Sequence, residues 1–462
     1  MSLSRRLVLK SAGVLPLLAS PFGSSAFNSQ ALAQTAPATP AASDIAPVLF
    51  VHGNGDHAAL WVTTIWRMES NGVPRDRMFA INFTDPLART DDKVEQPNRS
   101  STEDQRRELG EAIKDLKRRT GAARVALVGN SRGGNPIRNY IKNGGGADVS
   151  HAVLCGVPNH GVYDWDEGLG GEFNGRGPFL RGLNEGESEV TSGTAFLTLR
   201  SEGIDKFAQA DGRFVGKPGT PTGVTTEGPA LKGATNLALG AIDHRETAFH
   251  PRAFREIYKF IAGREPTRIE IVPESEVKLS GLVTGTPGGV QTNRPVSGAS
   301  VDVFRVSAAT GERIGGPIHS SQTSADGRWG PAQVEPAWHL EIVLTSTGST
   351  TTHLYRSPFP RSSDIVHLRA ARPLGPADAG AGAVVLMSRP RGYFGLPRDV
   401  VLIDGKEPAD VKPGVPTDSV TTLRLSAAEA GRAVVALFNQ ERIVARAWPA
   451  SENRIAVAEL TY

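Results

Sequence analysis

Six short apolar runs divide the first half of the chain, and each has the length of a buried β-strand. They cover residues 47–51, 78–81, 125–128, 151–155, 195–199 and 236–239. Two further segments carry apolar residues at helical spacing, namely Leu109, Ala112, Ile113 and Leu116, and then Phe254, Ile257, Tyr258 and Ile261. Strands that alternate with amphipathic helices are typical of a parallel sheet covered on both faces. Residues 45–265 are therefore predicted to form one α/β domain.

Local signals predict where these two helices begin and end. Ser100 and Glu103 have the spacing of a capping box, so the first helix is expected to start near Ser100 and to end at Gly121. Pro251 favours the first turn of the last helix, and Gly263 favours its C-terminal cap.

The pattern changes after Pro266, where helical spacing gives way to short alternating runs such as residues 300–303. Turn signals recur between these runs, and together they predict a β-sandwich over residues 266–372. An Ala-, Gly- and Pro-rich stretch then indicates a linker, and residues 378–462 are expected to form a C-terminal β-domain. The predicted fold class is thus a parallel α/β sheet flanked by helices, followed by one or two all-β, sandwich-like domains.

The N-terminus has the features of an export signal. Residues 4–10 resemble a twin-arginine motif, an apolar stretch follows, and residues 31–33 have the small-x-small pattern of a cleavage site. Prolines and a glycine interrupt the apolar stretch, which argues against a membrane anchor. Residues 1–33 are therefore predicted to be a twin-arginine signal peptide and residues 34–44 a linker, with the mature protein periplasmic or secreted.

Composition narrows the classes of function. The net charge is +3, but residues 1–33 hold three basic residues and no acidic one, so the remainder is formally neutral. No Lys/Arg-rich block indicates a nucleic-acid partner. Cys155 is the single cysteine, which excludes an intramolecular disulfide. No His/Cys/carboxylate cluster indicates a metal, and no phosphate-binding glycine loop indicates a cofactor.

The most informative motif is the run from Gly129 to Gly133, which places Ser131 between two glycines after an apolar strand and before a helical stretch. A serine at such a strand-to-helix turn is typical of the nucleophile elbow of an α/β-hydrolase. The turn is so sharp that side chains two residues before and after the serine would collide, and glycine has none. Ser131 is therefore the predicted nucleophile.

A serine hydroxyl needs a base, and the base needs an orienting acid, which in this fold follow in the order serine, acid, histidine. His244 lies between the last strand and the last helix, and it is preferred over His52, His160 and His250. Asp205, after the strand at 195–199, is the favoured acid, although it could simply cap a short helix at 206–208. Glu202 is the reserve candidate, and the side chain of Asp243 is expected to point elsewhere because it adjoins the histidine.

Two backbone N–H groups should stabilise the oxyanion that forms when a carbonyl is attacked. One is expected from Arg132, the residue after the nucleophile. The other is expected from Asn54 in the loop that follows the first strand. Each such donor typically contributes a factor on the order of 10²–10³ to the rate.

The motifs at residues 51–55, 129–133, 200–206 and 243–244 resemble those of bacterial and archaeal α/β-hydrolase lipases and esterases. The resemblance covers about residues 47–262, and some lipases of this group also carry C-terminal β-domains. It implies carboxylester hydrolysis through an acyl-enzyme, with Ser131, Asp205 and His244 as the triad. Asn130 stands where the common lipase form has histidine, and Arg132 stands where many relatives have a smaller or apolar residue.

Two Gly-rich insertions are expected to border the cleft, at about residues 160–194 and 214–232. The first is either a mobile lid or a fixed surface loop. The β-domains either dock on lipid or polymer through Trp329, Trp338 or Trp448, or stabilise the catalytic domain with these tryptophans in their core. The expected partner is an apolar or polyester-like ester. Amide hydrolysis, polyester depolymerisation and an inert polymer- or lipid-binding protein are the alternatives, and the oligomeric state stays open.

Overall fold

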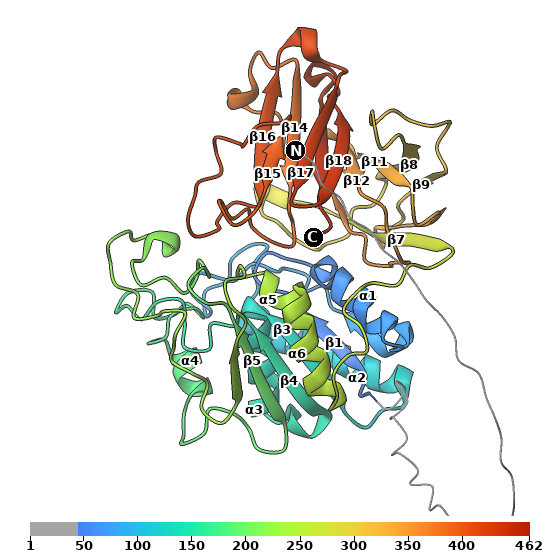
Figure 1. The fold of residues 1–462 in the computed structure, drawn as a ribbon. Helices are drawn as coiled ribbons and strands as arrows, with labels where there is room; N and C mark the ends of the chain where they lie inside the picture. The colour runs from blue at the N-terminus through green and yellow to red at the C-terminus, as the bar shows by residue number, and fades with distance from the viewer. Residues whose placement is uncertain (1–44) are drawn as a thin grey trace, which may run out of the picture. The chain divides into compact units, whose positions relative to one another are not determined.

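The computed structural model describes residues 45–462, so the predicted signal peptide and linker lie outside the described residues. Its first part is a six-stranded sheet in the order β2-β1-β3-β4-β5-β6, and every neighbouring pair is parallel (Figure 1). The strands are β1 (Val48–Val51), β2 (Met78–Ala80), β3 (Val125–Asn130), β4 (Val149–Cys155), β5 (Ala195–Arg200) and β6 (Thr235–Ala238). All six match the apolar runs of the sequence.

Helices pack on both faces of this sheet because successive strand residues point to opposite sides. Phe50, Val128 and Val153 belong to one buried cluster, which also holds residues of α1 (Val62–Ser70) and α6 (Pro251–Ala262). Leu49, Leu127 and Leu154 belong to another, with α2 (Thr102–Thr120) and α3 (Gly134–Lys142). Two short helices, α4 (Pro178–Leu183) and α5 (Glu246–Phe249), complete this part. The α/β-hydrolase class predicted from the sequence is confirmed.

The start of α2 differs by one residue from the prediction. Ser101 is the N-cap, and its hydroxyl accepts from Asp104 N–H while the Asp104 carboxylate accepts from Ser101 N–H. Ser100 is used elsewhere, because its hydroxyl donates to Asp85 O at 2.6 Å and accepts from the Arg132 guanidinium. Gly121 ends the helix in the left-handed conformation, as expected.

The remaining chain is β-rich (Figure 1). Two three-stranded sheets have the orders β10-β7-β13 and β15-β17-β18, and a seven-stranded sheet has the order β16-β14-β19-β12-β11-β8-β9. The strands are β7 (Val277–Thr284), β8 (Ser300–Val306), β9 (His319–Gln322), β10 (Arg328–Val334), β11 (His339–Thr345), β12 (Thr351–Arg356), β13 (Leu368–Arg369), β14 (Ala383–Ser388), β15 (Val401–Ile403), β16 (Val420–Leu425), β17 (Ala433–Phe438), β18 (Glu441–Arg446) and β19 (Arg454–Glu459).

The seven-stranded sheet draws on both segments that the sequence divides at residues 372–378. β12 pairs in parallel with β19, and β14 pairs with β19 on its other edge. The expected β-sandwich over 266–372 and the expected C-terminal β-domain over 378–462 therefore share one sheet. A composition change marks a connecting segment here, but strand pairing across more than 90 residues leaves no local signal in the sequence.

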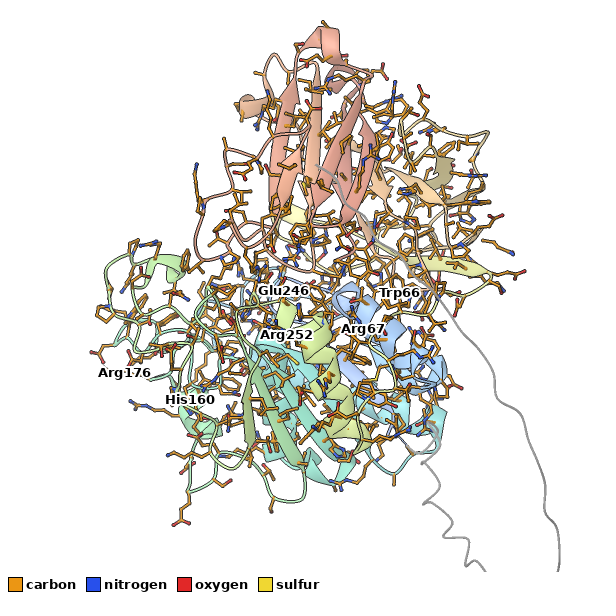
Figure 2. The ribbon with its side chains drawn as sticks, in the orientation of Figure 1. Trp66, Arg67, His160, Arg176, Glu246 and Arg252 are labelled. Atoms are coloured by element: carbon orange, nitrogen blue, oxygen red, sulfur yellow. The ribbon has the colours of Figure 1, made fainter. Side chains whose placement is uncertain are left out.

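Buried side chains also join the β-rich part to the α/β part. Trp66 of α1 packs edge-on against Phe359, and its indole N–H donates to Ser362 O at 2.9 Å. Figure 2 labels Trp66 and Arg67 on this helix. Trp329 is core, 1% exposed with its indole N–H bonded to Val366 O, and is unavailable for docking. Among the described helices, none combines the length and the apolarity that crossing a membrane requires.

Candidate active site

Ser131 follows β3 directly and has a φ of 53°, a left-handed backbone that residues with a side chain rarely adopt. A Cβ on Gly129 would lie 2.9 Å from the backbone of Gly133, and one on Gly133 would lie 2.6 Å from the carbonyl oxygens of Val51 and His52. Both glycines are thus required by close backbone approach, as the motif predicts. The strained turn at Ser131 is the kind of outlier that clusters at functional sites.

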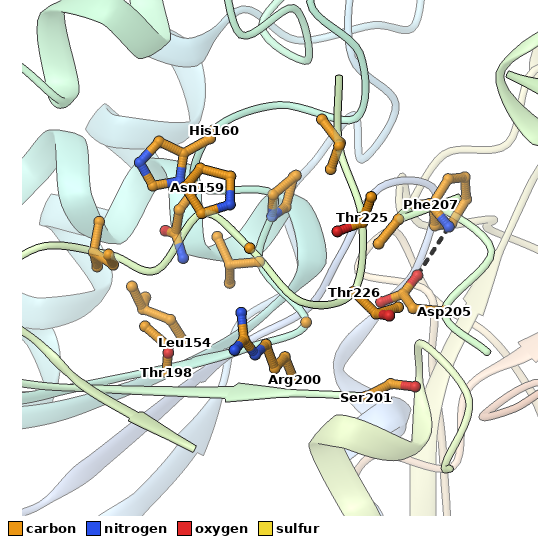
Figure 3. Close-up of a pocket in the computed structure, with 18 of the residues that line it drawn as sticks. Leu154, Asn159, His160, Thr198, Arg200, Ser201, Asp205, Phe207, Thr225 and Thr226 are labelled. Atoms are coloured by element: carbon orange, nitrogen blue, oxygen red, sulfur yellow. Dashed lines mark hydrogen bonds between the residues drawn. The ribbon is translucent and has the colours of Figure 1, made fainter. Parts of the chain in front are cut away.

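Asp205 and His244 are brought together from 39 residues apart. His244 Nδ1 and Asp205 Oδ2 are 2.8 Å apart, and both side chains are buried. The other carboxylate oxygen of Asp205 accepts from Phe207 N–H at 2.8 Å, so Asp205 both caps the following turn and contacts the histidine. Figure 3 shows Asp205 and Phe207 on one side of a pocket and His160 on the other. Glu202, the reserve acid, is exposed.

The other candidate residues have separate partners. His160 contacts the Glu189 carboxylate at 3.0 Å, and His250 caps α6 by accepting from Arg252 N–H. His52 is buried, with one ring nitrogen near Gly53 O and the other accepting from Phe83 N–H. The carboxylate of Asp243 accepts from Arg389 and Tyr393 N–H, so it is directed away from the His244 ring contact, as expected.

Ser131 and His244 line the same cleft, which has a volume of about 380 Å³. No hydrogen bond joins the two side chains, and the buried His244 Nε2 has no partner among residues 45–462. Buried polar atoms are normally satisfied, so an unpaired ring nitrogen in a residue that shares a cleft with a serine is an exception. Hydrogen bonds between a nucleophile and its base are often long without substrate and tighten when it binds.

The loop that carries Asn54 lies against the nucleophile. A Cβ on Gly53 would lie 2.9 Å from Ser131 Cβ, which explains why glycine stands there. The Asn54 side chain accepts from Ala88 N–H at 2.8 Å and so fixes the loop. In the described chain no acceptor faces the backbone N–H of Asn54. A free N–H in the loop that approaches Ser131 is the kind of donor that an oxyanion hole needs.

The side chain of Arg132 has a role that the sequence analysis missed. It is fully buried, its Nε lies 2.5 Å from Glu172 Oε1, and its two terminal nitrogens donate to Pro86 O and Ser100 O. Burial lowers the pKa of this guanidinium, and Glu172 opposes that effect. Because Glu172 belongs to the 160–194 insertion, the residue after the nucleophile ties that insertion to the elbow.

Asn130 is a second residue whose role was not foreseen, although its place before the serine was noted as a departure from the common motif. Its buried amide donates to Cys155 O at 3.0 Å and to Thr247 Oγ1 at 3.2 Å, and it lies 3.4 Å from His244 O. One side chain therefore joins the elbow, the end of β4 and the segment carrying His244.

Apolar side chains from both insertions line the cleft, as predicted. Val162, Tyr163 and Phe173 come from the first insertion, and Phe214 and Val215 from the second. Tyr393, from the loop after β14, was not foreseen as a lining residue. No group of three or more metal-ligating side chains occurs anywhere within residues 45–462.

Two family models match the chain. Residues 45–161 match the class 2 lipases, and residues 275–373 match the lipase C-terminal domain. The first match includes the Asn54 loop and Ser131, whereas Asp205 and His244 lie beyond it. These matches confirm the resemblance to α/β-hydrolase lipases and esterases, and they support a lipase-type hydrolase with a β-rich C-terminal part.

Solved structures with a similar fold include the product of gene lin2722 from Listeria innocua, with 17% identity, a TM-score of 0.33, and coverage of 47% of this chain and 94% of that one. Lipase B of Aspergillus fumigatus has 14% identity and a TM-score of 0.35, and the match covers 50% of this chain and 56% of that one. This chain therefore spans only about half of that lipase. Mature lipase BlEst2 of Bacillus licheniformis has 20% identity and a TM-score of 0.30, and the match covers 47% of this chain and 89% of that one. Comparison with curated proteins gave no match. All three TM-scores lie below 0.5.

Proposed function

We propose that this chain is an exported serine carboxylester hydrolase that acts on apolar esters through an acyl-enzyme. One observation carries the proposal: a serine on a left-handed elbow shares a cleft with a buried histidine whose other ring nitrogen contacts a buried carboxylate. This combination supplies a nucleophile, a base and an orienting acid.

In the proposed reaction, Ser131 Oγ attacks the ester carbonyl while His244 Nε2 takes the hydroxyl proton. Asp205 holds Nδ1–H and stabilises the imidazolium that forms. The backbone N–H groups of Asn54 and Arg132 stabilise the oxyanion of the tetrahedral intermediate. His244 then gives the proton to the leaving alkoxide, and the alcohol departs. Water, deprotonated by His244, attacks the acyl carbonyl. The ester bond to Ser131 then breaks, Oγ takes the proton back from His244, and the acid is released.

The cleft supports an apolar ester as substrate. Its lining combines aromatic and aliphatic side chains of both insertions with few polar groups near Ser131, namely Asn54, Asp56, Asn130 and Arg245. A concave, mostly apolar cleft with a few converging polar groups is the usual form of a small-molecule site. Lipids and polyesters both satisfy this chemistry, and export by the twin-arginine route would bring the enzyme to either.

An organophosphonate probe tests the nucleophile directly, because it forms a covalent bond with an activated serine. We expect stoichiometric labelling of the wild type, none of Ser131→Ala, and unchanged labelling of Ser192→Ala, which alters an exposed serine. Labelling that persists in Ser131→Ala would contradict the assignment of Ser131 as the nucleophile. A wild type that is neither labelled nor active would favour the alternative of an inert polymer- or lipid-binding protein.

Matched p-nitrophenyl esters and anilides test the reaction. We expect the esters to be cleaved far faster, and an acyl series from acetyl to palmitoyl, with a polyester film alongside, to report the preferred chain. Anilides cleaved as fast as the esters would identify an amidase with the same triad.

A further inference from the structure

The loop between β14 and β15 contacts the residues on both sides of the proposed base. Arg389 donates from Nη1 to Asp243 Oδ2 at 2.7 Å and from Nη2 to Glu246 Oε1 at 2.6 Å. Tyr393 N–H donates to the same Asp243 oxygen at 2.9 Å. In the opposite direction, Arg245 donates to Pro390 O at 2.8 Å. Every residue from 243 to 246 except His244 itself is thus bonded to this one loop.

These contacts are largely excluded from solvent. The side chain of Arg389 is 3% exposed, that of Asp243 is 0% and that of Glu246 is 7%. Figure 2 labels Glu246 at the start of α5, beside the β-rich region. Arg398 closes the outer rim by donating to Glu246 Oε2 at 2.7 Å. Burial raises the pKa of Asp243, and Arg389 opposes that rise.

The segment is also held from the elbow side. Thr247 Oγ1 donates to His244 O at 2.7 Å and accepts from Asn130 at 3.2 Å. The backbone of His244 therefore lies between the nucleophile elbow and the β14–β15 loop. A shift of about 1 Å in a reacting group can cost on the order of 10²-fold in rate. Contacts that fix the backbone of His244 therefore affect turnover directly.

Tyr393 belongs to the same loop and lines the cleft. Its ring lines the cleft together with Ser131 and His244. The Lys206 ammonium lies 3.9 Å from the ring centroid, and the Arg245 guanidinium lies 5.0 Å away. Cations over an aromatic ring restrict its orientation, which makes Tyr393 a fixed wall.

We infer that the β14–β15 loop is a working part of the active site. Arg389 is a positioning residue that holds His244 in place through Asp243 and Glu246. Tyr393 is a specificity-determining residue that lines the cleft. The inference rests on the proposed serine-hydrolase function. It assigns to the C-terminal β-rich part a role in turnover and selectivity, beyond stabilising the catalytic domain or docking on a surface.

The test of Arg389 compares kcat per titrated active site, so that loss of folded enzyme does not count as loss of rate. Arg389→Met is expected to lower kcat by about 10- to 100-fold with KM little changed, and Arg389→Lys to recover part of it. Arg432→Met removes a cation that pairs with Asp404 in the same β-rich region and should leave kcat unchanged. A kcat within twofold of the wild type in Arg389→Met would overturn the positioning role.

If Arg389→Met does not fold, Arg398→Gln decides the question, because it loosens Glu246 from a half-exposed rim. We expect kcat per active site to fall at least threefold, and an unchanged value overturns the role. For Tyr393→Ala, the ratio of kcat/KM for long-chain esters to kcat/KM for acetyl esters should change at least fivefold. An unchanged ratio would contradict the role of Tyr393 in specificity. A wild type that fails phosphonate labelling sinks the proposed function itself, and it is recognised before any of these variants is compared.

Discussion

Asp205 makes two hydrogen bonds that serve different purposes, one to His244 and one to the N–H of Phe207. Asparagine in its place retains one acceptor oxygen, so the turn can survive, but the neutral amide no longer stabilises an imidazolium. We expect Asp205→Asn to lower kcat by about 10³- to 10⁴-fold with a small change in the urea midpoint. Steady-state ester hydrolysis and urea unfolding measure the two effects.

Glu202→Gln is the matched control, since Glu202 lies three residues earlier in the same loop and is exposed. It should leave kcat within about twofold, as expected of surface substitutions. If Glu202→Gln were the damaging change, the acid would be assigned to the wrong residue.

Gly133 tests the steric argument for the elbow. A methyl group there would meet the carbonyl oxygens of Val51 and His52 at 2.6 Å, and backbone cannot move aside as a flexible side chain can. We expect Gly133→Ala to lower the free energy of unfolding by about 1–3 kcal/mol and to abolish phosphonate labelling. Gly182→Ala, on α4 with open space around it, should do neither. A labelled and stable Gly133→Ala would show that the turn is less cramped than the structure indicates.

At the scale of elements, local patterns predicted most of the α/β part. The six strands follow from apolar runs, and Ser131 follows from the glycines that its turn requires. Helix α1 was missed because its apolar positions were not singled out, and the cap of α2 moved by one residue because Ser100 serves Arg132 instead. Capping motifs one residue apart are hard to separate without knowing which hydroxyl has a tertiary partner.

Long-range charge pairs could not be predicted in this way. Arg132 and Glu172 are 40 residues apart, and Arg389 and Asp243 are 146 apart. Neither pair has a spacing that any helix or strand period would mark, and charged residues are ordinarily exposed. The sequence predicted Asp205 and His244 only because the order of the triad in this fold restricts where each can lie.

The insertion at 160–194 is tied to the elbow through Glu172, which also accepts from Asn135 at 3.0 Å. Removing one partner of a buried pair leaves a charge without compensation, at a cost of about 3–5 kcal/mol. We expect Glu172→Gln to lower the free energy of unfolding by an amount near the lower end of that range and to speed proteolysis within the insertion. Urea unfolding and limited proteolysis measure these effects.

Glu167→Gln is the control for that change, because Glu167 lies in the same insertion but is exposed and pairs with Lys217 at the surface. Exposed pairs contribute little, so no measurable change is expected. Equal protease sensitivity of wild type and Glu172→Gln would indicate that other contacts hold the insertion, which would favour a fixed loop over a lid.

At the scale of the whole molecule, the β-rich part is built into the α/β part through buried side chains rather than attached by a tether. Its seven-stranded sheet combines strands from both sides of the 372–378 segment, and its β14–β15 loop bonds Asp243, next to the proposed base. One buried cluster combines side chains of the α/β part with side chains of β7, β8 and β10 to β13, which predicts that these segments unfold together.

Two histidines at this junction make the stability of the molecule sensitive to acid. His57 of the α/β part and His367 of the β-rich part lie with ring centroids 5.3 Å apart. Burial is the main cause that lowers both pKa values, that of His367 to about 3. Leu282 N–H donates to His367 Nδ1 at 3.1 Å, a bond that protonation of this nitrogen would break. The unfolded chain, with a histidine pKa near 6.5, therefore takes up protons that the folded chain excludes.

Because the unfolded state binds more protons, the free energy of unfolding should fall as the pH drops below about 6.5. Between pH 7.5 and 5.5 the expected loss is about 1.4 kcal/mol for each such histidine, and urea unfolding at both pH values measures it. His367→Asn keeps an acceptor near the position of Nδ1 but cannot be protonated, so about 1.4 kcal/mol of the loss should disappear, even if the variant is less stable at pH 7.5. An identical slope in His367→Asn and wild type would place the acid sensitivity elsewhere in the molecule.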